Sequence, residues 1–290
     1  MNKVSTGIVG TKEKLAGTGQ SFRFGPETIL QLATAATLLV LAAVVFFIVK
    51  GAADSLLSAD LDLDVVFTAA VNSLLIAAAA MVIALPVSVL SALYITELAP
   101  SRPAKMLWAA LRLLSAVPSV VLGFIAWVWL VYHQSPQGTS PARISLIASF
   151  VLALIVYPSL TSFLVEQLMR IPASLKASSY ALGASRWQTI AYAVYPAARS
   201  GFAAAGFFGL GRVMGDTAIV LVLWQTAAKG GLLESQGHRL FAMPTAIAMA
   251  AETGQYYSEL FLMALLLMAL SIGFSSLSRR FMRSHWGVQE

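Results

Sequence analysis

The residues with the clearest chemical potential are an arginine and an aspartate in an apolar, glycine-rich stretch. Arg212 and Asp216 are four residues apart, so on a helix they would share a face, one turn from each other. Gly211 and Gly215 repeat this spacing, which lets helices approach closely. A guanidinium binds phosphoryl oxygens through paired hydrogen bonds, and a carboxylate can accept the proton of hydrogen phosphate, which sulfate lacks. The pattern predicts either an anion site that favours phosphate or an Arg–Asp pair that only fixes helix packing.

The chain around this stretch is apolar enough to lie in a membrane. Of 290 residues, 58% are hydrophobic and 11% are charged, whereas soluble domains carry about 25% charged residues. An arginine near the middle of a span costs about 2.5–3.5 kcal/mol on insertion scales, so Arg212 needs a compensating partner or a function. Six segments reach the length of about 20 residues that a spanning helix needs: Ile29–Val49, Val66–Tyr94, Met106–Val131, Ile144–Leu164, Ser200–Ala228 and Leu260–Ser278.

The distribution of Lys and Arg orients these spans. With the N-terminus in the cytoplasm, thirteen basic residues fall in cytoplasmic segments and four fall on the opposite side. Such an excess is typical of cytoplasmic loops, so the sequence predicts six spans with both termini in the cytoplasm. The same placement explains the net charge of +6 better than nucleic-acid binding does.

The spans divide the chain into three parts, with no linker or repeat inside the largest. We expect a polar N-terminal cytoplasmic tail over residues 1–28, a transmembrane domain over 29–283 and a cytoplasmic C-terminal tail over 284–290. Leu240–Ala251 is apolar but too short to span, so a re-entrant, interfacial or packed loop segment is expected there.

Prolines interrupt three of the spans, at Pro86, Pro118 and Pro158. A proline removes a helical hydrogen bond, and in a bilayer the freed carbonyl needs another partner. These prolines are expected either as tolerated kinks or as openings along a transport path. Hydroxyl residues near two of the prolines and after Asp216 are weaker candidates for hydrogen bonds along that path: Ser119, Thr161, Ser162 and Thr217.

A polar segment of about thirty residues, 169–199, separates two spans. Pro172 is expected to start one short helix, Gly183 permits a turn, and a second helix begins at Arg186. A loop of this length can fold and dock a partner. The alternative is an amphipathic helix at the membrane surface, with Trp187 at headgroup level.

Motifs for nucleotide binding and hydrolysis are missing from the sequence. There is no Gly-Lys-Ser/Thr phosphate-binding loop, no His-Glu-x-x-His and no Gly-x-Ser-x-Gly. Cysteine is absent as well, so no thiolate or iron–sulfur site is expected. We therefore do not expect the chain itself to be an enzyme.

Several patches together resemble the permease subunit of a phosphate-specific ABC importer, within the type-I ABC importer permease family. The coupling-loop spacing from Ala177 through Gly183 to Pro196 is kept, although the usual leading Glu-Ala-Ala is Ala177-Ser178-Ser179 here. Phosphate permeases usually have Glu at the position of Asp216. The remaining patches are residues 116–123, 158–166, 172–190, 209–217 and, closer to one of the two permease types, 245–252 with Arg279 and Arg280.

The resemblance implies an all-α, polytopic fold with six transmembrane helices and a cytoplasmic coupling-helix loop, in the bacterial cytoplasmic (inner) membrane. The implied function is a pathway for inorganic phosphate delivered by an extracytoplasmic phosphate-binding protein. Phosphonate, sulfate, and molybdate or tungstate are alternative substrates, and an ATP-independent secondary anion carrier is an alternative of another class.

The resemblance also implies partners. They are an ABC ATPase dimer, a second permease subunit that is a paralogue or a copy, the binding protein and membrane lipid. ATP with magnesium would be bound by the ATPase subunits, and this chain would hold no cofactor or metal. The residues implied in ATPase coupling are Ala177, Ser178, Ser179, Gly183, Arg186, Trp187 and Pro196.

Overall fold

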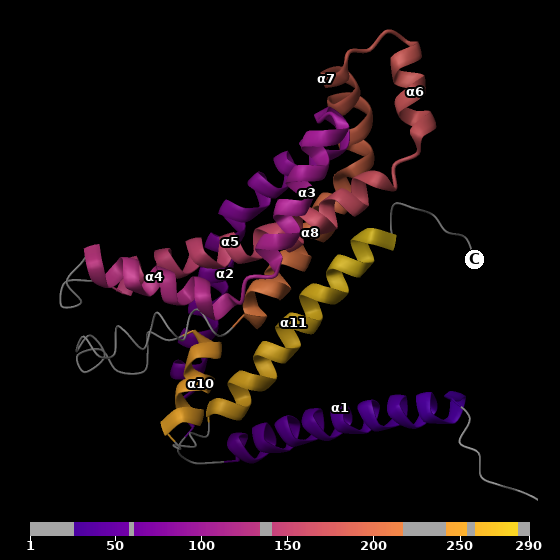
Figure 1. The fold of residues 1–290 in the computed structure, drawn as a ribbon. Helices are drawn as coiled ribbons and strands as arrows, with labels where there is room; N and C mark the ends of the chain where they lie inside the picture. The colour runs from indigo at the N-terminus through magenta and orange to yellow at the C-terminus, as the bar shows by residue number, and fades with distance from the viewer. Residues whose placement is uncertain (1–25, 58–60, 134–140, 217–241, 254–258, 284–290) are drawn as a thin grey trace, which may run out of the picture. The chain divides into compact units, whose positions relative to one another are not determined.

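The structure is a computed structural model that describes residues 26–57, 61–133, 141–216, 242–253 and 259–283. All regular secondary structure in these ranges is helical (Figure 1). The elements are α1 (Pro26–Leu56), α2 (Leu63–Leu93), the π-helix η1 (Tyr94–Leu98), α3 (Ser101–Ser115), α4 (Ser119–His133), α5 (Pro141–Met169), α6 (Ala173–Ala181), α7 (Arg186–Thr189), the π-helix η3 (Ile190–Val194), α8 (Tyr195–Gly215), α10 (Met243–Thr253) and α11 (Glu259–Arg283).

The chain divides into two compact units, residues 1–47 and 48–290. The described part of the first unit lies in α1, whose apolar side chains from Ile29 to Phe47 are almost all exposed. Lipid solvates such a helix without a packing partner, because the backbone groups are bonded within the helix itself.

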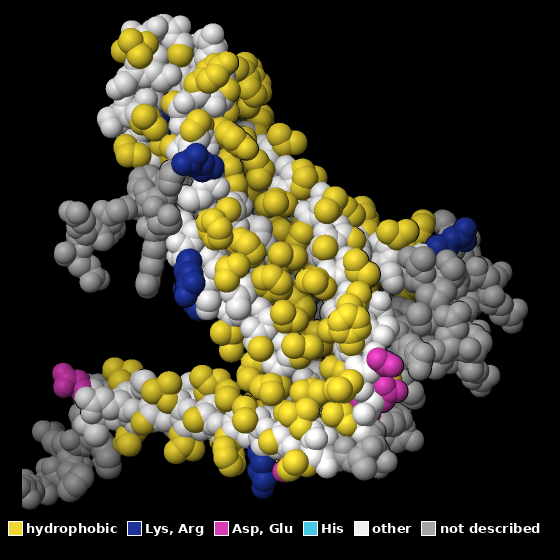
Figure 2. Space-filling view, turned by 180° about the vertical axis from the view of Figure 1, so that it is seen from behind, with side chains coloured by type: hydrophobic (Ala, Val, Ile, Leu, Met, Phe, Trp, Pro, Cys, Tyr) yellow, Lys and Arg dark blue, Asp and Glu magenta, His cyan; other side chains and the backbone are white. Residues whose placement is uncertain are grey.

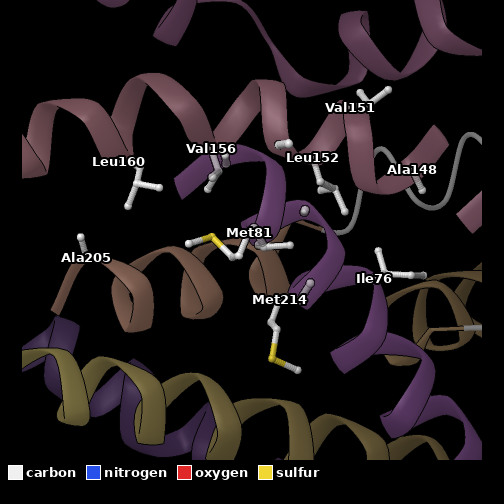
Figure 3. Close-up of a cluster of buried hydrophobic side chains, with 14 of the residues drawn as sticks. Ile76, Met81, Ala148, Val151, Leu152, Val156, Leu160, Ala205 and Met214 are labelled. Atoms are coloured by element: carbon white, nitrogen blue, oxygen red, sulfur yellow. The ribbon is translucent and has the colours of Figure 1, made fainter. Parts of the chain in front are cut away.

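The core of the second unit is formed by α2, α5 and α8, with α11 packed along α8. Small residues on the buried face of α2, among them Ala77, Ala80 and Ala84, allow α5 to approach closely. Figure 3 shows Met81 of α2 among the core side chains contributed by α5 and α8. This packing also brings α8, which carries Arg212 in its last turn, into contact with α2.

Four of the described helices are long and apolar enough to cross a membrane: α1, α2 with η1, α5 and α11. The pair α3 and α4, which meet at an angle of 83°, makes a fifth span if the bent pair is counted as one. The segment Met106–Val131 therefore contains two helices with a sharp break at Pro118, which is the opening that the sequence predicts as one of two alternatives. Pro118 has no N–H to continue the ladder and disfavours helical backbone at Val117, so the helix ends there.

The expected fifth span, Ser200–Ala228, falls partly outside the described residues. α8 begins earlier, at Tyr195, and ends at Gly215. Residues 217–228 lie outside the described residues, so the count of six spans stays a prediction.

The other two prolines lie inside continuous helices, Pro86 in α2 and Pro158 in α5. The possible opening of α5 at Pro158 is thus not formed. Near it, the Ser159 hydroxyl donates to the Val156 carbonyl at 2.9 Å, and the Thr161 hydroxyl donates to the Tyr157 carbonyl at 2.8 Å. Hydroxyls of α5 therefore bond to backbone carbonyls of the same helix around the proline.

The short apolar segment expected at Leu240–Ala251 contains α10, which packs against α2 and α11. Its first residue, Met243, is buried, and its N–H donates to the hydroxyl of Ser73 in α2 at 2.8 Å. α10 is thus a packed helix rather than an irregular loop, held to α2 by a buried hydrogen bond.

Hydrophobic side chains dominate the face of the molecule seen in Figure 2, and charged side chains on it are few. Large exposed apolar side chains occur along α2 and α5 as well as α1, for example Phe67, Val82 and Phe150. A surface of this kind needs lipid or another apolar partner, as expected for a multi-pass membrane protein.

Candidate functional site

The loop between α5 and α8 contains the two short helices that the sequence predicts. α6 follows Pro172, which is its N-cap, and α6 ends in a left-handed turn at Gly183, where φ is +83°. The N–H of Gly183 donates to the Tyr180 carbonyl at 2.9 Å, and the N–H of Ala184 donates to the Ser179 carbonyl at 3.2 Å. These two bonds form a Schellman motif, in which a residue with positive φ closes the helix end. Glycine is suited to this position because it has no Cβ.

The second helix, α7, begins with a reciprocal cap. The Ser185 hydroxyl accepts from the Gln188 N–H at 3.3 Å, and the Gln188 side chain accepts from the Ser185 N–H at 2.7 Å. This capping box satisfies backbone donors that a short helix would otherwise leave open. α7 continues without a gap through η3 into α8, so the loop is joined directly to a core helix.

Polar contacts hold the loop in place. The hydroxyl oxygens of Ser179 in α6 and Thr189 in α7 are 3.0 Å apart, and Thr189 is buried. The Nζ atom of Lys176 lies 2.6 Å from Oε1 of Glu97, which belongs to η1. The loop is therefore a folded element with defined attachments to the rest of the unit.

The outer surface of the loop exposes large apolar side chains on polar, capped helices. Leu182 is 89% exposed, Trp187 is 69% exposed and Tyr192 is 82% exposed. We call these three residues the loop surface. Exposed apolar side chains that are fixed by local structure favour docking of a partner.

The residues expected in ATPase coupling are exposed, with one exception, and their role in coupling stays a prediction. Ser179 is half-buried because it bonds to Thr189. Leu182 and Tyr192 were not among the expected residues, although an apolar side chain in a polar loop is a signal that could have identified them. The remaining expected residues are exposed: Ala177, Ser178, Gly183, Arg186, Trp187 and Pro196.

The other candidate site lies at the far end of α8. Arg212 is in the last turn and is exposed, and within the described part of the chain its guanidinium has no recorded ion pair or hydrogen bond. Asp216 is half-buried and has extended backbone, with φ −91° and ψ 92°, and its N–H donates to the Val213 carbonyl at 3.2 Å. Asp216 is therefore the first residue after α8 rather than a residue within it, and its pairing with Arg212 stays a prediction.

The weaker candidates for the path that the structure describes lie on two elements, α4 and α5. Thr161 is fully buried, and its hydroxyl already bonds to Tyr157 within α5. Ser162 is half-buried in α5, and Ser119 is half-buried at the start of α4 beside the break. Thr217 lies outside the described residues. Of the whole set, Arg212 combines charge and exposure and is the strongest candidate for contacting an anion.

The chain matches the family described as "Binding-protein-dependent transport system inner membrane component" over residues 84–284. This range contains the loop and the end of α8. The chain therefore belongs to that family and is a multi-pass inner-membrane permease component, not an ATPase subunit. The predicted family is confirmed.

Relatives support the same class. YqgH of Bacillus subtilis, a probable ABC transporter permease, is 37% identical over 50% of this chain and 47% of its own. The phosphate transport permease PstC of Mycobacterium leprae is 30% identical over 52% of this chain and 54% of its own. PstC of Xylella fastidiosa strain Temecula1 is 29% identical over 69% of this chain and 68% of its own. The chain spans about half the length of the first curated relatives it matches.

The fold is also that of a solved transporter. A chain from the crystal structure of a bacterial ABC transporter that imports the acidic polysaccharide alginate matches with a TM-score of 0.61. The match covers 86% of this chain and 96% of that chain at 16% identity. The all-α importer-permease fold is thus confirmed at the level of architecture.

Proposed function

We propose that this chain is a permease subunit of an ATP-driven importer and forms part of the path for inorganic phosphate. The observation that carries the importer assignment is the capped loop between α5 and α8, which exposes Leu182, Trp187 and Tyr192. The names of the PstC relatives support phosphate as the substrate.

The loop surface suits an ABC ATPase as its partner. Two ATPase subunits would bind ATP and magnesium, and their closing would displace the loop. Because α7, η3 and α8 are continuous, a displacement of α7 acts directly on α8, which carries Arg212 at its far end. A second permease subunit would complete the path, and an extracytoplasmic binding protein would deliver phosphate to it.

Arg212 is proposed as the main electrostatic contact for phosphate. Its guanidinium can donate two parallel hydrogen bonds to phosphoryl oxygens. An exposed arginine is expensive in lipid, so a water-filled path is the environment in which it is stable. Asp216 lies directly after the end of α8, four residues beyond Arg212, and is proposed as the acceptor of the phosphate proton. Thr217, Ser119, Ser162 and Thr161 are secondary candidates.

Six spans with both termini in the cytoplasm complete the proposed arrangement, with the permease domain over 29–283 and tails over 1–28 and 284–290. The chain has no natural cysteine, so a single introduced cysteine gives one labelling site. A cysteine at position 60 should react with a membrane-impermeant maleimide from outside. One at position 186 should react only after the membrane is opened. Labelling of both from the same side contradicts this topology.

The test of function is reconstitution of the transporter with its ATPase and binding protein in liposomes. Uptake of labelled phosphate, phosphonate, sulfate and molybdate is compared with and without internal ATP. ATP-dependent uptake of phosphate above the others is expected. Equal uptake without ATP by the isolated chain would instead establish a secondary carrier, and preference for another oxyanion would correct the substrate.

A further inference from the structure

The ion pair between Lys176 and Glu97 joins two elements that are far apart in sequence. Lys176 lies in α6, and Glu97 lies in η1, 79 residues earlier. The carboxylate side chain is only 6% exposed and the lysine side chain 23% exposed. Solvent screens the attraction of such a pair less than that of a surface pair, and removal of one partner leaves the other charge uncompensated.

α6 has no buried residue of its own. In the described structure it packs mainly against α7 and η3, and the chain that enters it from α5 is anchored by the buried Ile171. The Lys176 side chain adds a direct contact with Glu97 of η1. The ion pair therefore links the first loop helix to the continuation of α2.

η1 transmits force to the core because it continues α2 without interruption. The backbone of α2 passes directly into η1 at Tyr94, and the N–H of Ala99 closes η1 by donating to the Tyr94 carbonyl at 2.8 Å. After η1 the helix ends, and α3 begins beyond its N-cap, Pro100. A displacement of Glu97 therefore acts on the C-terminal end of α2, before α3 starts.

α2 and α8 contact each other along part of their length, where Met81 lies against Gly209. Beside Pro86 of α2 the two helices line an open apolar recess of about 510 Å³, with Leu85, Gly206 and Leu210 among its lining residues. The loop thus has three attachments: covalent ones to α5 through residues 170–172 and to α8 through α7 and η3, and an ionic one to the continuation of α2 through Lys176 and Glu97.

We propose that the Lys176–Glu97 ion pair is a positioning pair that couples movement of the loop to α2, so that α2 and α8 move together during transport. This inference rests on the proposed importer function. If the pair is intact, each ATPase cycle displaces both helices. If it is broken, the loop still docks and still moves α8, but α2 is left behind and ATP is hydrolysed without transport.

The experiment measures phosphate taken up per ATP hydrolysed by the full transporter in liposomes. Lys176→Met and Glu97→Gln remove one charge each, and Lys176→Glu with Glu97→Lys reverses the pair. Lys105→Met in α3 is the matched control, since Lys105 is an exposed lysine with no recorded ion pair in the described ranges. The single variants should retain the ATPase subunits and lose at least about five-fold in the ratio, and the reversed pair should return to within about two-fold of the wild type.

Single variants with the wild-type ratio would overturn the proposal, as would an assembled reversed pair that remains uncoupled. If the single variants do not assemble, the reversed pair decides the question alone, because it restores attraction between the two positions. Failure of the importer function is separate: it appears as absence of ATP-driven uptake by the wild-type transporter, before any variant is compared. If the transporter imports another oxyanion, the same test is made with the uptake of that oxyanion per ATP hydrolysed.

Discussion

The hydroxyl oxygens of Ser179 and Thr189 lie 3.0 Å apart across the turn between α6 and α7. Thr189 is 1% exposed, so the contact ties an exposed helix to a buried position at the base of the loop. Together with the Schellman motif at Gly183 and the cap at Ser185, it fixes the angle between two helices that are too short to be stable alone. The loop surface is therefore presented in one orientation before any partner binds.

Gly183→Ala should weaken ATPase binding by disturbing this turn. At φ +83° a Cβ is strained even though no atom lies within 4 Å of it, and the left-handed conformation costs about 1–2 kcal/mol for a non-glycine residue. The loss is measured as the salt concentration at which the ATPase dissociates from the purified complex. Gly273→Ala in α11 is the control, because its Cβ also has open space around it. Equal behaviour of the two variants would contradict a role for the turn.

Arg212→Gln should reduce phosphate uptake about 10- to 100-fold while the complex still assembles. A charge-assisted hydrogen bond contributes about 1.5–3 kcal/mol, and glutamine keeps polarity without the charge. Arg212→Lys should also impair uptake because it loses the planar fork. Arg199→Gln, an exposed arginine in the first turns of the same helix, should leave uptake near the wild-type value.

Asp216→Asn tests whether the carboxylate determines the preference for phosphate over sulfate or only the rate of phosphate uptake. If the carboxylate accepts the phosphate proton, the variant should discriminate less between phosphate and sulfate in a competition assay. Normal phosphate uptake with sulfate still excluded would assign Asp216 a structural role only.

Gly201→Ala should destabilise the packing of α8 on α5. The added Cβ would lie 3.0 Å from Cβ of Gln167, an atom next to the backbone that cannot move without the helix. Overpacking of this kind costs about 1–3 kcal/mol. Gly206→Ala is the comparison, since the nearest atom to its Cβ is a Leu85 methyl at 3.9 Å. Unfolding of the purified chain in increasing dodecyl sulfate measures the difference, and equal midpoints would contradict it.

Ser73→Ala should destabilise the attachment of α10 to α2. The Met243 N–H would lose its acceptor in a buried position, which costs about 1–3 kcal/mol. Thr34→Ala is the matched control, because the exposed Thr34 hydroxyl bonds only to the Leu30 carbonyl of its own helix. The same dodecyl sulfate titration should separate the two variants, and a shift as small as that of Thr34→Ala would show that Ser73 is not needed.

Local signals predicted much of the loop correctly. Pro172 and Gly183 act through their own backbone preferences, so the start of the first helix and the turn could be placed from sequence, whereas the cap at Ser185 was not anticipated. Spacing alone could not show where α8 ends, and Asp216 is the first residue after it. At Pro118 the sequence left a kink and an opening as alternatives, and the structure has two helices that meet at 83°.

The sequence by itself determined the class of this protein: an apolar chain with a basic cytoplasmic bias, a dockable polar loop and a permease-like pattern over most of its length. Only the tertiary structure decided that Lys176 meets Glu97 and that Ser73 accepts from the first N–H of α10. The physical reason is the range of the interactions. The effects of hydropathy, proline and glycine act within a few residues of the chain. The contact between Lys176 and Glu97 depends instead on how whole helices pack against one another.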